Sequence, residues 1–381
     1  MTYTKLLRGF GALTSAVFIA VSAFGLYGCG REIPVFPENA EDEAATALVP
    51  ESPYLEESVT VSSAKNATVS AGSAKAGKTF IMAEMVAADS ISGQVDQVFC
   101  DKVKELSNGS ITIELHTSGE LGSENDIIDS MISGTSDVDL CRISAFFLTN
   151  YGGRQSALLS LPYTFKDREH FWKFAKSNLA KQILAEPSEN GFGLRGLFLG
   201  EEGFRHFFSN KPIRDIDDLK GLRIRVSTDP VMNSLVESLE AKPVVTNFEK
   251  IADSFKDGTI DAAEQPIVNY EANNFNDVAD TIILDSHTLG AIQIIITDSA
   301  FNSLTEEEQG YLYEAAEYTA DFNRNLSEFN EAQSLKLLEK EGCHIIPVDD
   351  ITPYRNAAAD VIAENTKGYE YVYQQILSYG D

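Results

Sequence analysis

Two arginines lie two residues apart in a short apolar segment, Gly221–Val226. If this segment is a β-strand, its apolar side chains point to one face of the sheet, and Arg223 and Arg225 point to the other. Guanidinium groups inside a sheet are costly unless an anion meets them, and each presents two parallel donors that match a carboxylate. Because ligands of open α/β sheets bind beyond the carboxyl ends of the strands, Arg225 is the better candidate. A solvent-facing edge strand or an internal salt bridge would explain the same periodicity equally well.

The segments that position these arginines alternate between strand and helix patterns from Lys78 onward. Apolar periodicity and its stop signals predict strands over residues 79–85, 111–115, 138–143, 222–226, 243–246 and 259–263, and helices over residues 90–107, 123–133, 216–220, 230–240 and 248–256, the last capped by Asn247. Strands and helices that alternate at such intervals favour parallel β-α units.

A longer helix is expected near the C-terminal end, where Thr305–Glu308 forms a capping box. The apolar stripe of this helix contains Ala315, Thr319, Phe322, Leu326 and Phe329. Two α/β units and a long connecting helix over about 300 residues predict two lobes. We expect the lobes to be formed by discontinuous segments, roughly 78–200 and 201–300, with later C-terminal helices.

The N-terminal 29 residues carry export signals. Lys5 and Arg8 precede an apolar stretch, Gly9–Gly25, which is too short and too rich in small and hydroxyl residues for a membrane span and is typical of a signal peptide. Leu26–Cys29 resembles a bacterial lipobox, which implies that residues 1–28 are removed and that Cys29 carries a diacylglyceryl group. Two acyl chains suffice for stable anchoring. The alternative is a plain secretory signal with a chance cysteine.

The segment that follows Cys29 is not expected to fold. It contains four prolines, an acidic group at 41–43 and a stretch of small residues at 62–77. Such a composition buries too little apolar surface to offset its ordering entropy. Residues 29–77 are therefore predicted to form a flexible tether that spans about 40 Å root-mean-square. We expect an exported protein on the outer side of the cytoplasmic membrane, or in the periplasm.

The formal net charge of the whole chain is −28, and removal of Lys5 and Arg8 makes it two units more negative. This charge excludes a general electrostatic attraction to nucleic acid or anionic lipid. An anionic ligand would need a locally positive site, which makes an arginine at a cleft informative.

The cysteine and histidine positions predict neither a disulfide framework nor a metal site. Once Cys29 is lipidated, three cysteines remain, so that at most one bridge can form among Cys100, Cys141 and Cys343. Cys100 and Cys141 lie in apolar patterns typical of core positions. The five histidines are scattered, without the spacing of metal ligands on a helix. We expect no metal and no cofactor.

Several motifs together give the chain a family resemblance. They are Gly203–Arg205, Ser209–Ile213, Asp218–Val226, Ser107–Ile111, Gly119–Gly122, Leu161–Phe165, Ala241–Pro243, Asn247–Glu249 and Gly258–Asp261. In this order and spacing, over roughly residues 78–367, they resemble the DctP-type solute-binding proteins of TRAP transporters. The resemblance implies a two-lobed fold of the periplasmic-binding-protein kind, type II-like, with a long connecting helix.

The resemblance also implies roles for particular residues. The arginine that ends the family's Gly-Leu-Arg-Ile-Arg strand clamps the ligand carboxylate, and here it is Arg225. The arginine of Gly-x-Arg, here Arg205, often adds a second contact, and the aromatic residue at the next helix start, here Phe248, often lines the pocket. The family's Asp-Gly-x-Glu-Asn-Pro motif reads Asp261–Pro266 here, with Gln265 in place of the ligand-binding asparagine and an alanine in place of the glycine.

Glu84 and Arg142 are two further candidates, because each lies where cleft residues are expected. Glu84 follows the first predicted strand, and Arg142 lies in the third. For each residue a structural or solvated role is as plausible as a ligand contact. An Arg142 that faces Arg225 across the cleft would suit a ligand with two anionic groups.

The favoured function is capture of a small organic acid and its delivery to a TRAP-type membrane permease, without catalysis. One alternative is an exported hydrolase or lyase acting on organic acids, although the chain lacks a Gly-x-Ser-x-Gly elbow, a His-Glu-x-x-His motif and a phosphate-binding glycine loop. Another alternative is a binding module for a sensor kinase, which would need the same cleft. The sequence does not distinguish transport from sensing.

Overall fold

The computed structural model describes residues 77–381. The predicted signal peptide (1–28), Cys29 and nearly all of the predicted tether (29–77) lie outside the described residues. The strands are β1 (Lys78–Ala83), β2 (Ile111–His116), β3 (Val138–Ser144), β4 (Leu194–Ser209), β5 (Arg223–Val226), β6 (Lys242–Val245), β7 (Ala262–Pro266), β8 (Thr281–Thr297) and β9 (His344–Pro347).

The helices lie between these strands and after them. The α-helices are α1 (Ile91–Leu106), α2 (Glu124–Ser133), α3 (Arg168–Ala175), α4 (Asn178–Glu189), α5 (Pro230–Ser238), α6 (Ile251–Lys256), α7 (Ile267–Ala272), α8 (Asp298–Asn302), α9 (Glu306–Glu341), α10 (Thr352–Ala357), α11 (Ala359–Asn365) and α12 (Glu370–Ser378). Short 3-10 helices are η1 (Ala145–Tyr151), η2 (Arg154–Ser160), η3 (Ile216–Leu219), η4 (Phe248–Lys250) and η5 (Phe275–Asp277). In residues 77–381 no helix combines the length and the apolar character that a membrane crossing requires.

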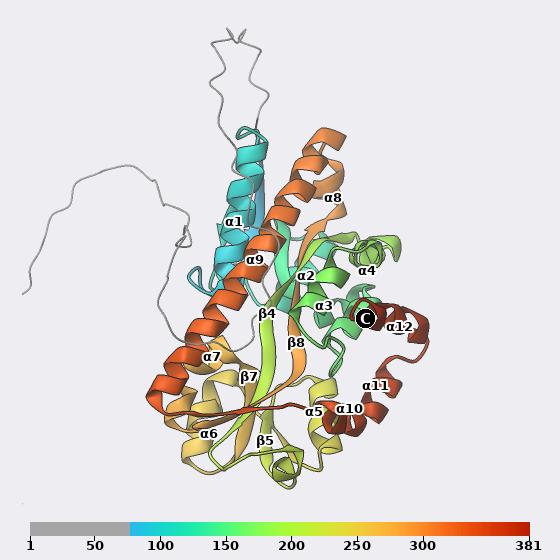
Figure 1. Cartoon of the computed structure of the whole chain (residues 1–381). Helices are drawn as coiled ribbons and strands as arrows, with labels where there is room; N and C mark the ends of the chain where they lie inside the picture. Colours follow the sequence, from blue (N-terminus) through green and yellow to red (C-terminus); the bar gives the residue numbers. More distant parts are fainter. Residues whose placement is uncertain (1–76) are drawn as a thin grey trace, which may run out of the picture. The chain divides into compact units, whose positions relative to one another are not determined.

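The strands form one sheet in the order β2-β1-β3-β8-β4-β7-β5-β6, with β9 also paired to β8. β1 is parallel to β2 and β3, and β5 is parallel to β6 and β7, which confirms the predicted parallel units. The two central strands, β4 and β8, are antiparallel to each other and run between the two parallel groups (Figure 1). β4 and β8 both extend through the two halves of the sheet. The predicted lobe boundaries near residues 200 and 300 therefore remain a proposal.

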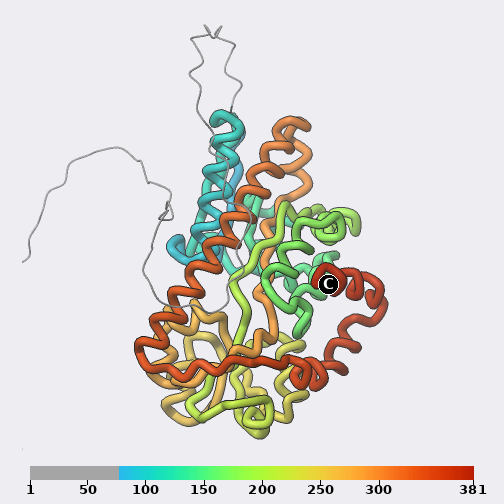
Figure 2. Tube along the Cα trace, in the orientation of Figure 1, coloured from blue at the N-terminus to red at the C-terminus, as the bar shows by residue number. Residues whose placement is uncertain are grey.

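The core is divided in the same way as the sheet. One cluster of buried apolar side chains includes Phe99, Trp172 and Leu312. Two others gather around β5 with α5 and around β7 with α7. After β9 the chain returns through α10 and α11, and α12 adds Tyr373 and Ile376 to the first cluster (Figure 2).

The long helix α9 begins where the sequence predicts it. The Thr305 hydroxyl accepts from the backbone N–H of Glu308, whose carboxylate accepts from the backbone N–H of Thr305, so the predicted capping box is confirmed. α9 packs along α1 and β4 and reaches α7 (Figures 1 and 2). It therefore extends beside both halves of the sheet. Cys100 and Cys141 are buried, as predicted, and Cys343 is also a free thiol.

Three local predictions are wrong. The strand predicted over residues 259–263 begins only at Ala262, as β7, because a turn at Gly258 (φ +73°) occupies residues 257–259. Asn247 does not cap the helix after it with its side chain, since its amide donates to Glu249 at 3.2 Å and the segment starts as a 3-10 turn. Phe329 is 45% exposed and lies outside the buried face of α9, which continues beyond it at Ser334 and Leu338.

Candidate functional site

A pocket of about 330 Å³ lies where β4, β5, β7 and β8 meet. Its walls carry several charged and polar side chains. Four of the six predicted site residues line this pocket, namely Arg225, Arg205, Gln265 and Phe248. The other two, Glu84 and Arg142, do not line it. The remaining lining residues include Ser144, Phe146, Ser160, Glu202, Ser227, Asp229, Met232, Glu264, Asn269 and Thr288.

Arg225 is buried in β5 but has no ion-pair partner among residues 77–381. Only 4% of its surface is exposed, and its Nε donates to the carbonyl oxygen of Thr246 at 2.9 Å. Burial lowers the pKa of Arg225 from its ordinary value, and the nearby charge of Arg205 lowers it too, while Glu264 opposes this shift. A buried cation without a paired anion is unfavourable, so an anionic ligand would stabilise this side chain.

Arg223, two residues earlier on the same strand, behaves differently. It is partly exposed, and its guanidinium donates to both carboxylate oxygens of Asp261 at 2.8 Å. An internal salt bridge, which was one alternative explanation for the two arginines, therefore accounts for Arg223 but not for Arg225. The carboxyl end of β5 therefore presents one arginine to the pocket.

Arg205 lies on β4 and is already paired. Its Nε donates to the carboxylate of Glu264, and one Nη donates to the Glu264 carbonyl at 3.4 Å. Burial alone would raise the pKa of Glu264, but Arg205 and His287 lower it to about 2. Both members of the pair are therefore charged, and their opposite charges cancel. Arg225 remains as the uncompensated cation of the pocket.

Gln265 and Phe248 complete the wall near Arg225. Gln265 is buried in β7 directly after Glu264, at the position where the resemblance places a ligand-binding amide. Phe248 is 40% exposed, and its ring meets that of Phe275 edge-on at 5.9 Å. An amide donor and a partly exposed ring next to an arginine suit a small organic anion.

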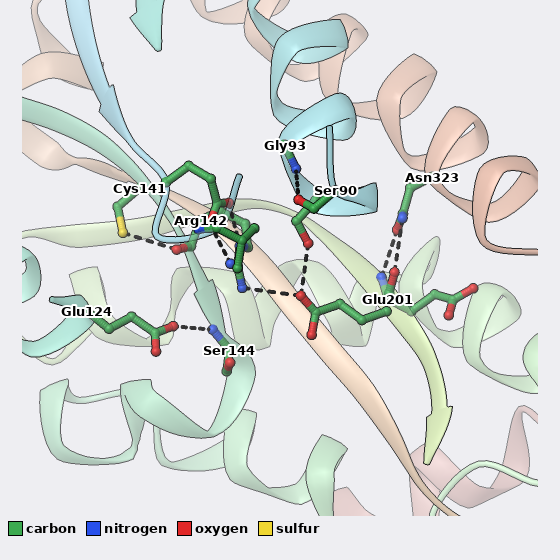
Figure 3. Close-up of polar contacts among 12 residues, drawn as sticks. Ser90, Gly93, Glu124, Cys141, Arg142, Ser144, Glu201 and Asn323 are labelled. Atoms are coloured by element: carbon green, nitrogen blue, oxygen red, sulfur yellow. Dashed lines mark hydrogen bonds and ion pairs between the residues drawn. The ribbon is translucent and has the colours of Figure 1, made fainter. Parts of the chain in front are cut away.

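Arg142 and Glu84 bind each other instead of facing the pocket. Arg142 Nε and Nη2 donate to the two carboxylate oxygens of Glu84 at 2.7 and 2.6 Å. The third nitrogen of Arg142, Nη1, lies 3.5 Å from Oε1 of Glu202 (Figure 3 shows Arg142 in this network). With all three nitrogens opposite carboxylates, Arg142 is not presented to a second anionic group.

Glu202 and Asp229 are acidic residues of the wall that were not predicted from the sequence. Asp229 caps α5 by accepting from Val231 N–H at 2.9 Å, and burial raises its pKa from the ordinary value. An aspartate followed by Pro230 is a helix-start signal that could have located it. Glu202 belongs to a long strand that was not predicted at all.

An irregularity in β4 places Glu202 at the wall. The register against β8 shifts between Glu201 and Phe204, and Gly203 has φ +96°. Glu201 turns into the interior, where its backbone exchanges hydrogen bonds with the Asn323 amide of α9 (Figure 3). Its neighbour Glu202 reaches the pocket. Bulges commonly re-aim a side chain in this way, and a glycine within a strand is the sequence signal for one.

A second cavity, of about 400 Å³, lies between α3, α4, β4 and α9. Its lining is mainly apolar and includes Trp172, Leu184 and Phe198, but none of the predicted site residues. In the described part of the chain, no cluster of three or more histidine, cysteine or acidic side chains is arranged to hold a metal ion. The pocket at Arg225 is therefore the candidate site for an anionic ligand.

Known proteins share both the sequence pattern and the fold. The model of bacterial extracellular solute-binding protein, family 7 (DctP) matches residues 82–368. A solute-binding protein of Roseobacter denitrificans is 28% identical over 267 residues, which cover 70% of this chain and 80% of that protein. The C4-dicarboxylate-binding protein DctB of Bacillus subtilis is 26% identical, over 71% of this chain and 77% of that protein.

Solved structures agree with these relatives. A TRAP periplasmic solute-binding protein of Pseudomonas putida F1 with bound D-glucuronate has a TM-score of 0.70 and 25% identity, and the match covers 78% of this chain and 96% of that one. One from Roseobacter denitrificans with bound L-galactonate has a TM-score of 0.66 and 26% identity, and covers 80% and 99%. The predicted two-lobed fold of periplasmic binding proteins is confirmed. The chain belongs to family 7 of the bacterial extracellular solute-binding proteins, the DctP family of TRAP transporters.

Proposed function

We propose that this protein captures a small organic acid by holding one carboxylate on Arg225. The observation that supports this most directly is a buried guanidinium that lines the pocket and has no ion-pair partner in residues 77–381. A carboxylate fits the guanidinium in a bidentate geometry and removes the cost of the unpaired buried charge. The ligand would then be surrounded, on the same side of the pocket, by Arg205, Gln265 and Phe248.

Closure of two lobes around the ligand is the second part of the proposal. The pocket is lined from both halves of the sheet, and β4 and β8 join these halves. A hinge in such long strands allows a rigid-body closure. The closed form would be recognised by a TRAP-type permease, the partner that the family implies. Acidic sugars, which are bound in two of the related structures, are suitable first ligands to test.

Attachment to the membrane through lipid on Cys29 is the third part. This proposal depends on the Leu26–Cys29 motif, because the cysteine lies outside the described residues. A tether of the length predicted for residues 29–77 would let the binding domain reach a permease in the same membrane.

The test of the clamp is ligand binding by two arginine variants of one strand. The chain from residue 29 onward, with Cys29→Ser, is titrated calorimetrically with acids that raise its melting temperature. Arg225→Ala should weaken binding by about 30-fold to several thousand-fold, since the loss of a buried charge partner costs about 2–5 kcal/mol. Arg223→Ala is the matched control, because Arg223 is tied to Asp261 and should leave the affinity unchanged. Equal affinity of the Arg225 variant and the unsubstituted protein would refute the clamp.

A further inference from the structure

We propose that Glu202 makes this pocket select acids with one carboxylate and hydrogen-bond donor groups, and reject acids with a second carboxylate on that side. The proposal rests on the proposed function, in which Arg225 holds the first carboxylate. It assigns a specificity role to a residue that lines the pocket and lies directly before Gly203, where β4 is irregular.

Arg142 is the arginine that could have received a second carboxylate. Arg142 is 6% exposed, and its Nε and Nη2 are bound to Glu84. Its Nη1 lies 3.5 Å from Glu202, which is 29% exposed and lines the pocket. The group that a ligand meets on this side is therefore the carboxylate of Glu202, with the guanidinium behind it.

The charges of the pocket wall favour a ligand with a single carboxylate. Arg205 and Glu264 neutralise each other, so Arg225 is the one uncompensated cation among the lining residues that the structure describes. Glu202 and Asp229 are the carboxylates that remain on the wall. A ligand with one carboxylate balances Arg225. A second carboxylate would lie near the negative charges of these residues in a partly desolvated pocket. This repulsion should lower the affinity for such a ligand by about tenfold or more.

Glu202 has room for a hydrogen bond from a ligand. Its Oε1 accepts from the Ser92 hydroxyl at 2.9 Å and faces Arg142. Its Oε2 has no hydrogen-bond partner within residues 77–381, and a carboxylate can only accept. A hydroxyl or amino group of the ligand would satisfy this oxygen. The structure thus favours a polyhydroxy or amino acid with a single carboxylate over a dicarboxylate.

Pairs of sugar acids test this proposal directly. An aldonate and the aldarate of the same carbon skeleton, such as L-galactonate with galactarate or D-gluconate with D-glucarate, differ only at one terminal carbon, where the aldarate has a carboxylate in place of a hydroxymethyl group. Calorimetric titration of the chain from residue 29 with Cys29→Ser should show aldonates binding at least about tenfold more tightly than their aldarates. An amino acid with one carboxylate, tested beside them, distinguishes hydroxyl donors from ammonium donors.

Glu202 variants then identify the residue responsible. Glu202→Gln should narrow the aldonate-to-aldarate ratio by about tenfold, mainly through tighter aldarate binding, because the repelling charge is lost. Glu202→Asp keeps the charge and should keep most of the discrimination. Glu105→Gln is the matched control, since it removes one charge from an exposed site on α1 and should leave the ratio unchanged. Unfolding curves without ligand verify that each variant folds.

The outcomes separate this proposal from the one on which it rests. If aldarates bind as tightly as aldonates, or if Glu202→Gln leaves the ratio unchanged, Glu202 is not the selecting residue, even where Arg225→Ala still abolishes binding. If none of these acids binds, the ligand is not an acid with several hydroxyl or amino groups, whichever carboxylate Arg225 holds. Binding that survives Arg225→Ala would overturn the clamp and this proposal together.

Discussion

His287 and Asp285 form a fully buried pair, with His287 Nδ1 2.9 Å from Oδ2 of Asp285. On its other side, His287 Nε2 lies 3.7 Å from Oε2 of Glu264, which carries the ion pair with Arg205 in the pocket wall. The ring stacks on Phe207, with centroids 4.3 Å apart. The histidine thus links the wall of the pocket to the interior of β8.

This pair predicts that the protein loses stability at alkaline pH. Burial alone would lower the pKa of His287, but Asp285 and Glu264 raise it to about 9. A raised histidine pKa stabilises the folded state fully below the unfolded value of about 6.5, and this contribution, about 3 kcal/mol, is lost as the pH rises through 9. His287→Asn should therefore be less stable than the unsubstituted protein at every pH, because the buried ring is lost, and the difference should be clearly larger near pH 6 than above about pH 10.

Urea unfolding at several pH values measures this difference. His116→Asn, at a partly exposed site on β2, is the control and should leave the stability profile unchanged. A constant difference between His287→Asn and the unsubstituted protein at all pH values would show that His287 packs but does not ionise.

The Arg142–Glu84 pair predicts a large loss of stability when its charge balance is broken. Burial alone would raise the pKa of Glu84, and Arg142 lowers it from the ordinary value. Glu84→Gln leaves a buried guanidinium short of a partner, which should cost about 3–5 kcal/mol in the free energy of unfolding.

The control for this substitution is Asp96→Asn in the same buried cluster. Asp96 is fully buried, and burial together with the neighbouring Glu84 raises its pKa well above the ordinary value. We expect Asp96 to be neutral in the folded protein, so the amide should be tolerated at neutral pH. A loss of stability with Asp96→Asn as large as that with Glu84→Gln would contradict this assignment.

Gly203 predicts a combined effect on stability and ligand selection. Its φ of +96° is unfavourable for other residues, and an added Cβ would lie 3.4 Å from Oε2 of Glu331. Gly203→Ala should therefore cost about 1–3 kcal/mol of stability and should alter the aldonate-to-aldarate ratio by displacing Glu202. Gly191→Ala, in a turn with φ +80° and open space, should cost stability without changing the ratio. The two variants are compared by unfolding and by titration.

Cys29 predicts membrane attachment. Expressed in a bacterium with residues 1–28 present, the protein should incorporate radiolabelled palmitate and sediment with membranes. Cys29→Ala should lose the label and leave the protein unanchored, because alanine lacks the sulfur atom to which the diacylglyceryl group would be attached. An unlabelled protein, or a label that survives the substitution, would support a plain secretory signal instead.

The sequence by itself determined the elements whose signals are local. Strand periodicity placed Arg225 on a strand that ends at the pocket, and the capping box at Thr305–Glu308 located the start of α9. The family motifs located Arg205, Phe248 and Gln265, all of which line that pocket. These features depend on residues within a few positions of one another, so a linear pattern records them.

The tertiary structure alone decided which charges are available to a ligand. Both Arg142 and Arg225 lie in predicted strands, so the sequence pattern does not distinguish them. In the structure Arg142 is paired with Glu84, 58 residues earlier, whereas Arg225 has no such partner in residues 77–381. Glu202 reaches the pocket through a bulge in β4, a strand defined by its pairing with the distant β8. The net charge of a binding site is a sum over side chains brought together by long-range pairing, and no local pattern contains that sum.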